Sequence, residues 1–182
     1  MSYPTIRPEL SGDESAVRDA VLRAFDGQER VAELADALRA SAAWIDGLSF
    51  VAECDGELVG QVMLTRSLLD APARLVDVLV LSPLGVVPEY QGRGIGSRLV
   101  QHALAAARER HEPPVFLEGD PDYYTRFGFE PGSGLGFRRP SLRIPEPAFL
   151  VRRLPSCQPW MTGTLVYAET FWQLDCVGLR DE

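Results

Sequence analysis

The sequence has few cysteines, few histidines and little positive charge, and each shortage excludes a class of protein. Its 182 residues contain three cysteines, Cys54, Cys157 and Cys176, which are odd in number and widely spaced. This pattern is not typical of a disulfide framework or a metal site, and it favours buried or idle thiols in a reducing cytoplasm. The two histidines, His102 and His111, have no companion ligands at metal-binding spacing, so we expect no bound metal.

Positive charge is also scarce, because 18 Lys and Arg residues face 26 Asp and Glu residues, giving a net charge of −8. A basic surface for nucleic acid is therefore not expected, whereas a cationic substrate such as an amine is compatible with this charge. No apolar run is long enough to span a membrane, and Met1–Thr5 lacks the features of a signal peptide. We therefore expect one cytoplasmic domain over residues 1–182, with a core over about residues 3–170.

A glycine-rich stretch, Leu84–Ser97, is the most informative part of the sequence. It reads LGVVPEYQGRGIGS and follows an apolar, β-branched run at Val76–Leu81 that predicts a buried strand. Residues 95–110 carry apolar side chains at helical spacing, with Ile95, Leu99 and Ala103 on one face. The glycines therefore join a buried strand to the first turn of a helix.

Such a junction is suited to binding an anion. The first N–H groups of a helix are unpaired and carry the positive end of its dipole, and glycines let an anion approach the backbone closely. Arg93 and Arg98 add positive charge, so we expect a phosphate or pyrophosphate here. A tight turn that binds no ligand is the plainer alternative.

Two other phosphate-binding motifs fit less well. A P-loop requires Lys followed by Ser or Thr after the last glycine, whereas Ser97 and Arg98 follow here. A dinucleotide-binding fold requires G-x-G-x-x-G directly after the strand, but this stretch has G-x-G-x-G preceded by Val87–Gln91. Glu118 keeps an NAD or FAD site open, because it ends an apolar run where a ribose-binding acid would stand.

Residues Gln91–Gly96 fit the Q/R-x-x-G-x-G/A motif, and Val86–Tyr90 resembles its usual lead-in, so the sequence resembles the GNAT superfamily of N-acetyltransferases. This resemblance implies that the loop binds the pyrophosphate of acetyl-CoA. It also implies that Leu84, Gly85 and Val86 contact the pantetheine arm, and that a backbone N–H near Val86 polarises the thioester carbonyl.

A second motif strengthens the resemblance. Tyr124 stands four residues before Gly128-Phe129, as in the Y-x-x-x-G-F motif, and residues 119–131 resemble the YhbS-like branch of the family. The resemblance implies that Tyr124 is a general acid toward the CoA thiolate. Asp120–Asp122 stands where many members have an asparagine that contacts the cofactor, and an aromatic plug is the structural alternative for Tyr124. The residues implied in cofactor binding are Leu84, Gly85, Val86, Gln91, Gly92, Arg93, Gly94, Ile95, Gly96, Ser97, Tyr124 and Phe127.

The expected fold is a mixed α/β (α+β) domain of the GNAT type, with a mostly antiparallel central sheet and flanking helices. Pro83 cannot donate to a β-ladder, so we expect the central strand to bulge or part from its neighbour near residues 82–85. The resemblance implies the same splay between the fourth and fifth strands. We expect Pro131–Pro147 to be a long loop, and strands at Ala148–Leu154 and Thr164–Ala168 to form a hairpin, through which a homodimer is conceivable.

The expected activity is acetyl transfer from acetyl-CoA to a primary amine of a small molecule or peptide, by direct attack in a ternary complex. The ammonium must lose a proton, and Glu118 and Asp77 are candidate bases because both are carboxylates on strands near the expected splay. Either is also compatible with a structural role. Two alternatives stay open: a CoA-binding regulatory module without turnover, and the nucleotide-cofactor fold.

Overall fold

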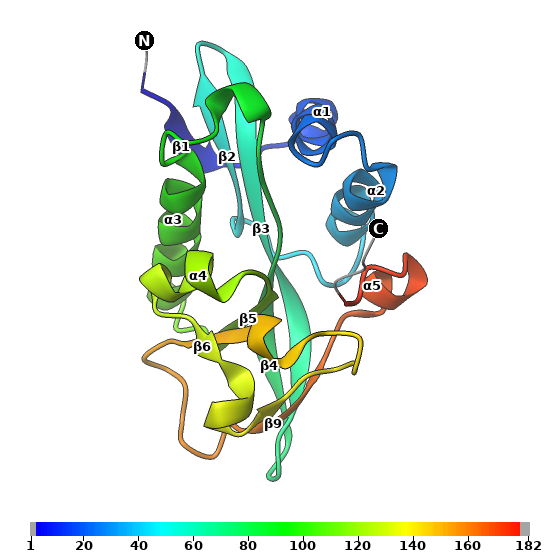
Figure 1. The fold of residues 1–182 in the computed structure, drawn as a ribbon, viewed down its shortest axis with the longest axis vertical. Helices are drawn as coiled ribbons and strands as arrows, with labels where there is room; N and C mark the ends of the chain where they lie inside the picture. The colour runs from blue at the N-terminus through cyan, green and yellow to red at the C-terminus, as the bar shows by residue number, and fades with distance from the viewer. Residues whose placement is uncertain (1–2, 179–182) are drawn as a thin grey trace. The chain divides into compact units, whose positions relative to one another are not determined.

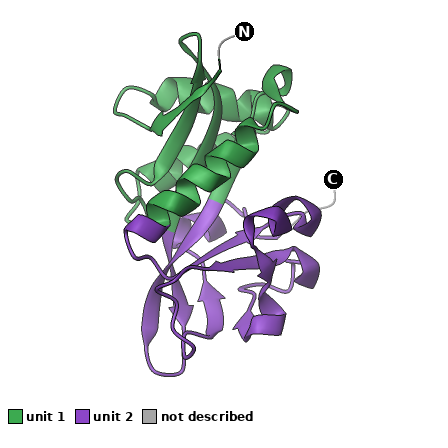
Figure 2. Ribbon diagram, turned by 90° about the vertical axis from the view of Figure 1, so that its left-hand side faces the viewer, with its two compact units in different colours: residues 1–65, 82–107 green, residues 66–81, 108–182 purple. Residues whose placement is uncertain are grey.

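The computed structural model describes residues 3–178, which divide into two compact units (Figure 2). Unit 1 holds described residues up to 65 together with 82–107, and unit 2 holds 66–81 together with those from 108 onward. Two strands, β3 (Glu57–Asp70) and β4 (Leu75–Val86), contribute residues to both units. The expectation of a single domain stays a prediction.

The strands are hydrogen-bonded in the order β1-β2-β3-β4-β5-β8-β6, with β7 and β9 off this path. The described pairings are antiparallel except for β4 with β5 and β7 with β9, so the predicted mixed, mostly antiparallel fold is confirmed (Figure 1). The remaining strands are β1 (Thr5–Pro8), β2 (Ser49–Cys54), β5 (Pro114–Glu118), β6 (Glu130–Pro131), β7 (Phe137–Arg138), β8 (Phe149–Arg153) and β9 (Gly163–Val166). The α-helices are α1 (Glu14–Ala24), α2 (Glu29–Arg39), α3 (Ile95–Glu109), α4 (Pro121–Tyr124) and α5 (Glu169–Gln173).

Unit 1 has helices on both faces of its strands. Successive residues of a strand point to opposite faces, and β2 shows this clearly. Phe50 meets the ring of His102 on α3 edge-on at 4.8 Å, whereas Val51 packs in a buried cluster with Val17 of α1 and Ala32 of α2. Figure 1 accordingly shows α3 on one side of β1–β3 and α1 and α2 on the other.

A two-residue turn, Asp55-Gly56, joins β2 to β3. Asp55 and Gly56 have φ values of 51° and 83°, and Cys54 pairs with Glu57 across them. Positive φ at both central residues matches the twist of a two-residue hairpin, which explains the preference for Asp-Gly.

In unit 2, β5 is flanked by two different neighbours. It pairs with β4 in parallel at Leu79–Val115 and Val80–Phe116, and with β8 in antiparallel register along all of its residues. The β4–β5 register described for residues 3–178 ends at these two pairs, although β4 continues to Val86. This short pairing agrees with the predicted parting of the two strands.

The predicted C-terminal hairpin is wrong. The connection over residues 154–162 leads away from β8, and β9 pairs with β3 and β7. Gly163 allows this, because a Cβ at that position would lie 2.0 Å from the carbonyl oxygen of Asp70 at the end of β3. A homodimer was expected to form through this hairpin, and the described residues do not form the hairpin.

The segment predicted as a long loop, Pro131–Pro147, contains short pieces of structure. It starts at the end of β6 and contains β7 and a 3₁₀ turn at Gly132–Leu135, and a second 3₁₀ turn, Glu146–Ala148, begins near its end. Phe137 meets Phe116 edge-on at 5.1 Å, so this segment contributes to the core of unit 2. Within residues 3–178, every helix is too short or too polar to traverse a lipid bilayer.

Candidate functional site

The glycine loop lies in unit 1 at the N-terminus of α3, as the sequence predicts. A 3₁₀ turn at Pro88–Tyr90 follows β4 and leads into Gln91–Gly94, all of which are exposed. Gly92 and Gly94 have φ values of 71° and 76°, in the left-handed region that side chains disfavour, and no atom lies within 4 Å of where their Cβ would be. The backbone of this loop is therefore open to a ligand.

Two side chains of the loop fold back onto its lead-in. The amide of Gln91 donates from Nε2 to the carbonyl of Val86 at 2.9 Å, and Arg93 donates to the carbonyl of Glu89 at 2.9 Å. The Arg93 guanidinium also lies over the Tyr90 ring, 5.1 Å from its centroid. These contacts restrain the conformation of the loop relative to its lead-in.

Arg98, the other arginine expected to add positive charge here, contacts the start of the chain. It donates to the carbonyl of Pro4 at 2.8 Å and lies over the ring of Tyr3, so it joins α3 to the start of the chain. The first turn of α3, Ile95–Ser97, has N–H groups that find no partner within a helix. These groups are the donors best placed to bind an anion.

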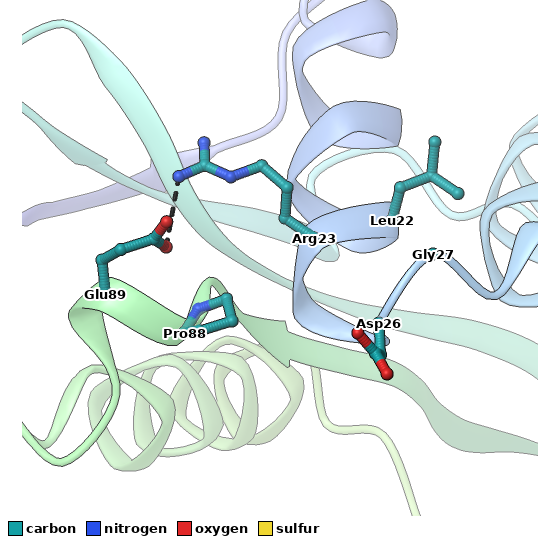
Figure 3. A pocket seen from close by; sticks show the side chains of 6 residues that line it. All are labelled: Leu22, Arg23, Asp26, Gly27, Pro88 and Glu89. Atoms are coloured by element: carbon teal, nitrogen blue, oxygen red, sulfur yellow. Dashed lines mark hydrogen bonds and ion pairs between the residues drawn. The ribbon is translucent and has the colours of Figure 1, made fainter.

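A shallow pocket of about 300 Å³ adjoins the lead-in to the loop, within unit 1 (Figure 3). Its wall includes an ion pair, in which Arg23 of α1 approaches Glu89 at 3.3 Å and also bonds Glu57 of β3 at 2.5 Å. The lead-in is thus anchored to a helix and a strand of its own unit. The pocket is lined by Leu22, Arg23, Asp26, Gly27, Pro88 and Glu89.

The predicted arm-binding residues Leu84, Gly85 and Val86 form the half-buried end of β4. Gly85 has a requirement that the sequence did not reveal, because a Cβ there would lie 2.8 Å from Cβ of Ala24 and 2.9 Å from the Phe25 ring. The end of α1 therefore packs directly on the backbone of β4. Only a long-range contact explains this glycine, so no local pattern could have identified its role.

Tyr124 lies in unit 2 at the end of α4, which Asp120 caps. The Asp120 carboxylate accepts from the Asp122 N–H at 2.9 Å, and Gly128 ends the following turn with φ of 79°. The Tyr124 ring meets Tyr123 and Phe129 edge-on at 4.9 and 5.7 Å.

Phe127 completes this cluster, with its ring centroid 5.5 Å from that of Tyr123 and 6.4 Å from that of Tyr124. Burial raises the pKa of the Tyr124 phenol above its ordinary value, and the neighbouring Tyr123 adds to this shift. The hydroxyl group therefore keeps its proton throughout the physiological pH range.

Glu118, the last residue of β5, lies in a different environment of unit 2. Its Oε1 accepts from the Tyr167 hydroxyl at 2.8 Å, and its Oε2 accepts from the Gly178 N–H at 3.0 Å. Desolvation raises the pKa of this carboxyl above its ordinary value, although the bonds from Tyr167 and Gly178 and the charge of Arg143 act in the opposite direction. Glu118 does not cap the turn after it, which is a role that Asp120 fills.

Asp77 is not brought together with Glu118. The register Val80–Phe116 puts Glu118 on the same face as Val80, and the two-residue period of a strand puts Asp77 on the opposite face. Asp77 is exposed and lies near the ion pair of Arg66 with Glu112, at 2.7 Å, where it adds a small contribution to the raised pKa of Arg66. This position is compatible with the structural role that the sequence leaves open for Asp77.

Sequence reasoning missed Tyr167, Gly178 and Gly119. Tyr167 and Gly178 contact Glu118 from 49 and 60 residues away, and no spacing links them. Gly119 had one weak signal in the sequence, which is its position between Glu118 and Asp120, the residue that caps α4. The described residues contain no cluster of three or more His, Cys, Asp or Glu side chains that could hold a metal ion.

Comparison with known proteins finds similarity over a part of the chain that includes the glycine loop and Tyr124. Residues 5–132 match the sequence profile of the acetyltransferase (GNAT) domain. The uncharacterized N-acetyltransferase YhbS of Escherichia coli is 31% identical over 169 residues, covering 91% of this chain and 97% of the relative. A second E. coli relative, the uncharacterized N-acetyltransferase YjhQ, is 35% identical over 122 residues, which are 67% of each chain.

Two solved structures are similar to this chain over most of its length. E. coli YhbS in complex with CoA superimposes with a TM-score of 0.82 at 29% identity, covering 92% of this chain and 91% of that one. A GNAT family acetyltransferase from Brucella melitensis in complex with acetyl-CoA gives a TM-score of 0.74 at 28% identity, covering 94% of this chain and 99% of that one.

Proposed function

Because this chain belongs to the GNAT family of acetyltransferases, it is an acyltransferase, and we propose that it transfers an acetyl group from acetyl-CoA to a primary amine. The observation that carries the proposal is the exposed Gln91–Gly94 loop, which has Gly92 and Gly94 in the left-handed region and leads directly into α3. Relatives that share this fold are described with CoA or acetyl-CoA bound. The family membership disfavours the NAD or FAD alternative.

In this proposal the backbone N–H groups of Gly92–Ser97 bind the pyrophosphate of acetyl-CoA, because the Gln91 N–H already bonds the carbonyl of Pro88 at 3.2 Å. The β4 residues Leu84, Gly85 and Val86 bind the pantetheine arm, and a backbone N–H near Val86 polarises the thioester carbonyl. The N–H of Val87 is not that donor, because it already bonds the carbonyl of Val59 at 3.0 Å. Tyr124 and Phe127 complete the set of cofactor residues.

The proposed chemistry requires the removal of two protons from an ammonium substrate. Glu118 takes the first proton, and the free amine then attacks the thioester carbon to form the C–N bond. As the C–S bond breaks, Tyr124 donates its phenolic proton to the CoA sulfur and regains a proton from the nitrogen. The products are the amide, CoA as the thiol, and one proton that Glu118 releases to solvent.

Glu118 suits the role of base better than Asp77. Its raised pKa makes the carboxylate a stronger base, which favours proton abstraction close to neutral pH. Asp77 is exposed beside the Arg66–Glu112 ion pair on the opposite face of the strands, where a structural role is sufficient. The net charge of −8 is compatible with a cationic acceptor.

The test is the release of CoA thiol from acetyl-CoA in the presence of a panel of primary amines. Amine-dependent release supports the proposal. Binding of acetyl-CoA without release by any amine favours the alternative, a CoA-binding regulatory module. Calorimetry at millimolar acetyl-CoA separates these outcomes from a failure of the loop to bind, which would contradict both.

A matched pair of glycine variants tests the loop itself. Gly94→Ala places a side chain at φ of 76° in the loop, and Gly56→Ala does the same at φ of 83° in the β2–β3 turn, with open space around both. The loop variant is expected to weaken acetyl-CoA binding about tenfold more than the turn variant. A cytoplasmic location, expected from the number and spacing of the cysteines, stays a prediction.

A further inference from the structure

The C-terminal segment Asp175–Gly178 reaches Glu118 and contacts it through its backbone. The N–H of Gly178 lies 3.0 Å from Oε2 and 3.3 Å from Oε1 of the Glu118 carboxylate. The Tyr167 hydroxyl donates to Oε1 from another element, at 2.8 Å. One carboxylate at the end of β5 therefore binds two donors that follow it in the chain by 49 and 60 residues.

Glycine at position 178 is required for this contact. Its φ is +91°, and a Cβ there would lie 2.6 Å from Cβ of Arg143 and 3.0 Å from the Arg143 carbonyl oxygen. No side chain fits, because both of these atoms belong to a neighbouring segment and cannot rotate away. The absence of a side chain lets the Gly178 N–H approach Glu118.

The segment around Gly178 is attached at three other points. Val177 is completely buried, Asp175 forms an ion pair with Arg143 at 2.9 Å, and the N–H of Cys176 bonds the carbonyl of Phe171 at 2.8 Å. These contacts hold the backbone in place independently of Glu118. The N–H of Gly178 is consequently a preorganised donor.

We infer that the Gly178 N–H is a positioning group for acetyl transfer, which orients the Glu118 carboxylate and stabilises its charged form as the base. This inference rests on the proposed function, since it gives Glu118 the role of base. Segment 175–178 is then part of the active site, and the Pro131–Pro147 segment supports it through Arg143.

The charged and titratable groups around Glu118 fix the sign of the expected effect. Tyr167 stays a neutral donor, because burial and the nearby Glu118 charge raise its pKa well above the ordinary value. Arg143 is a cation whose charge favours the carboxylate, and Asp175 balances part of it. Removing the Gly178 N–H takes away a donor to the charged form, so the pKa of Glu118 must rise further.

The sharpest test replaces the Gly178 N–H by an ester oxygen without adding any side chain. Cys176 is two residues earlier, so a synthetic peptide over residues 176–182 that carries glycolic acid at position 178 can be ligated to the rest of the chain. The matched control is the same ligation with the native peptide. The ester protein is expected to show a Glu118 pKa about one unit higher, measured by carbon-13 titration of glutamate carboxyls and assigned with Glu118→Gln.

The acid limb of kcat/KM against pH is expected to move upward by the same amount, with KM for acetyl-CoA unchanged. Gly178→Ala is a second variant with the same expected direction, and Gly12→Ala, at φ of +102° in open space, controls for backbone strain alone. An equal Glu118 pKa in the ester and native proteins overturns the inference. The carboxyl titration requires no turnover, so it decides the inference even if thiol release shows that the proposed function has failed.

Discussion

Burial of the Tyr124 ring determines the state of its hydroxyl group. The ring is enclosed by Tyr123, Phe127 and Phe129, and desolvation raises the pKa of the phenol. A phenol that stays protonated is an available acid for a leaving thiolate. The same aromatic packing is also what a purely structural tyrosine would show, so the hydroxyl itself must be tested.

Tyr124→Phe removes the hydroxyl and keeps the ring. If Tyr124 is the acid, kcat is expected to fall roughly ten- to several-hundred-fold while the Kd for acetyl-CoA changes little. The measurements are steady-state thiol release and calorimetry on the same preparation. Unchanged turnover would remove the acid role and leave Tyr124 as part of the aromatic cluster.

Gly119 positions the Tyr124 ring from the side of β5. A Cβ at Gly119 would lie 2.5 Å from Cε2 of Tyr124 and 3.2 Å from Cδ1 of Leu117, so Gly119→Ala must displace the ring. We expect kcat to fall at least tenfold, in the same direction as for Tyr124→Phe. Gly134→Ala is the control, because open space surrounds that glycine in the same unit.

The double variant Gly119→Ala/Tyr124→Phe separates positioning from general damage. If Gly119 acts through the Tyr124 hydroxyl, adding Gly119→Ala to Tyr124→Phe is expected to lower kcat little further. A full multiplicative loss would show that Gly119→Ala harms the protein by some other route.

These glycines show what could be predicted from the sequence and what could not. Gly92 and Gly94 were predicted because their role is local: a turn between strand and helix. Gly85, Gly119 and Gly178 instead accommodate side chains or backbone of other segments. Tertiary contacts require glycine at these three positions, and the spacing of residues in the sequence does not reveal such contacts.

At the scale of elements, tertiary contacts also explain why the prediction of a C-terminal hairpin was wrong. Local signals predicted the positions of β8 and β9 well, because each is a short β-branched or apolar run. Their partners depended on the path of the 154–162 connection and on the close approach of Gly163 to β3. The sheet order was predicted correctly where the family resemblance supplied it, at the β4–β5 pair.

The start of α1 is fixed to the first two strands by an ionic network. Arg7 of β1 bonds Asp13 at 2.7 Å and Glu53 of β2 at 2.9 Å, and Asp13 also accepts from the Leu10 N–H at 2.8 Å. The hydrogen bond from Arg7 is the main reason that the pKa of Asp13 lies below its ordinary value. Asp13 therefore contributes to the stability of this network only while it is charged.

Asp13→Asn is expected to lower the free energy of unfolding by about 1 kcal/mol at neutral pH. Because the folded-state pKa of Asp13 is depressed, its contribution is present above the unfolded-state pKa and is lost as pH falls through the folded-state value. Urea titrations of wild type and variant between about pH 7 and pH 2.5 should converge at the acid end.

The control for that experiment is Asp46→Asn. Asp46 is exposed and takes part in no ion pair among the described residues, so its replacement should change stability by less than about 0.5 kcal/mol at every pH. A difference between wild type and Asp13→Asn that stays constant down to low pH would contradict the electrostatic explanation.

At the scale of the whole molecule, the two compact units share their strands. β3 and β4 each supply residues to both units, and the GNAT domain match over residues 5–132 includes parts of both. Opening either unit therefore breaks strands that the other unit also uses. We propose that the chain unfolds as one domain, in agreement with the expectation from its length.

The three tryptophans allow each unit to be observed separately. Trp44 lies in unit 1, and Trp160 and Trp172 lie in unit 2. Trp44→Phe leaves only the indoles of unit 2, and the double variant Trp160→Phe/Trp172→Phe leaves only that of unit 1. If unfolding is cooperative, urea transitions followed by fluorescence and by circular dichroism should coincide within each variant.

Stabilisation by acetyl-CoA gives a stricter test of whether the two units unfold together. Acetyl-CoA binds only the folded chain in our proposal, so it must raise the free energy of unfolding by RT ln(1 + [L]/Kd), about 2.7 kcal/mol at a hundredfold excess over Kd. If β3 and β4 couple the units, both fluorescent variants report this gain in full, although the glycine loop belongs to unit 1 alone. A shift of the Trp44 transition without a shift of the Trp160 and Trp172 transition would show that the two units unfold independently.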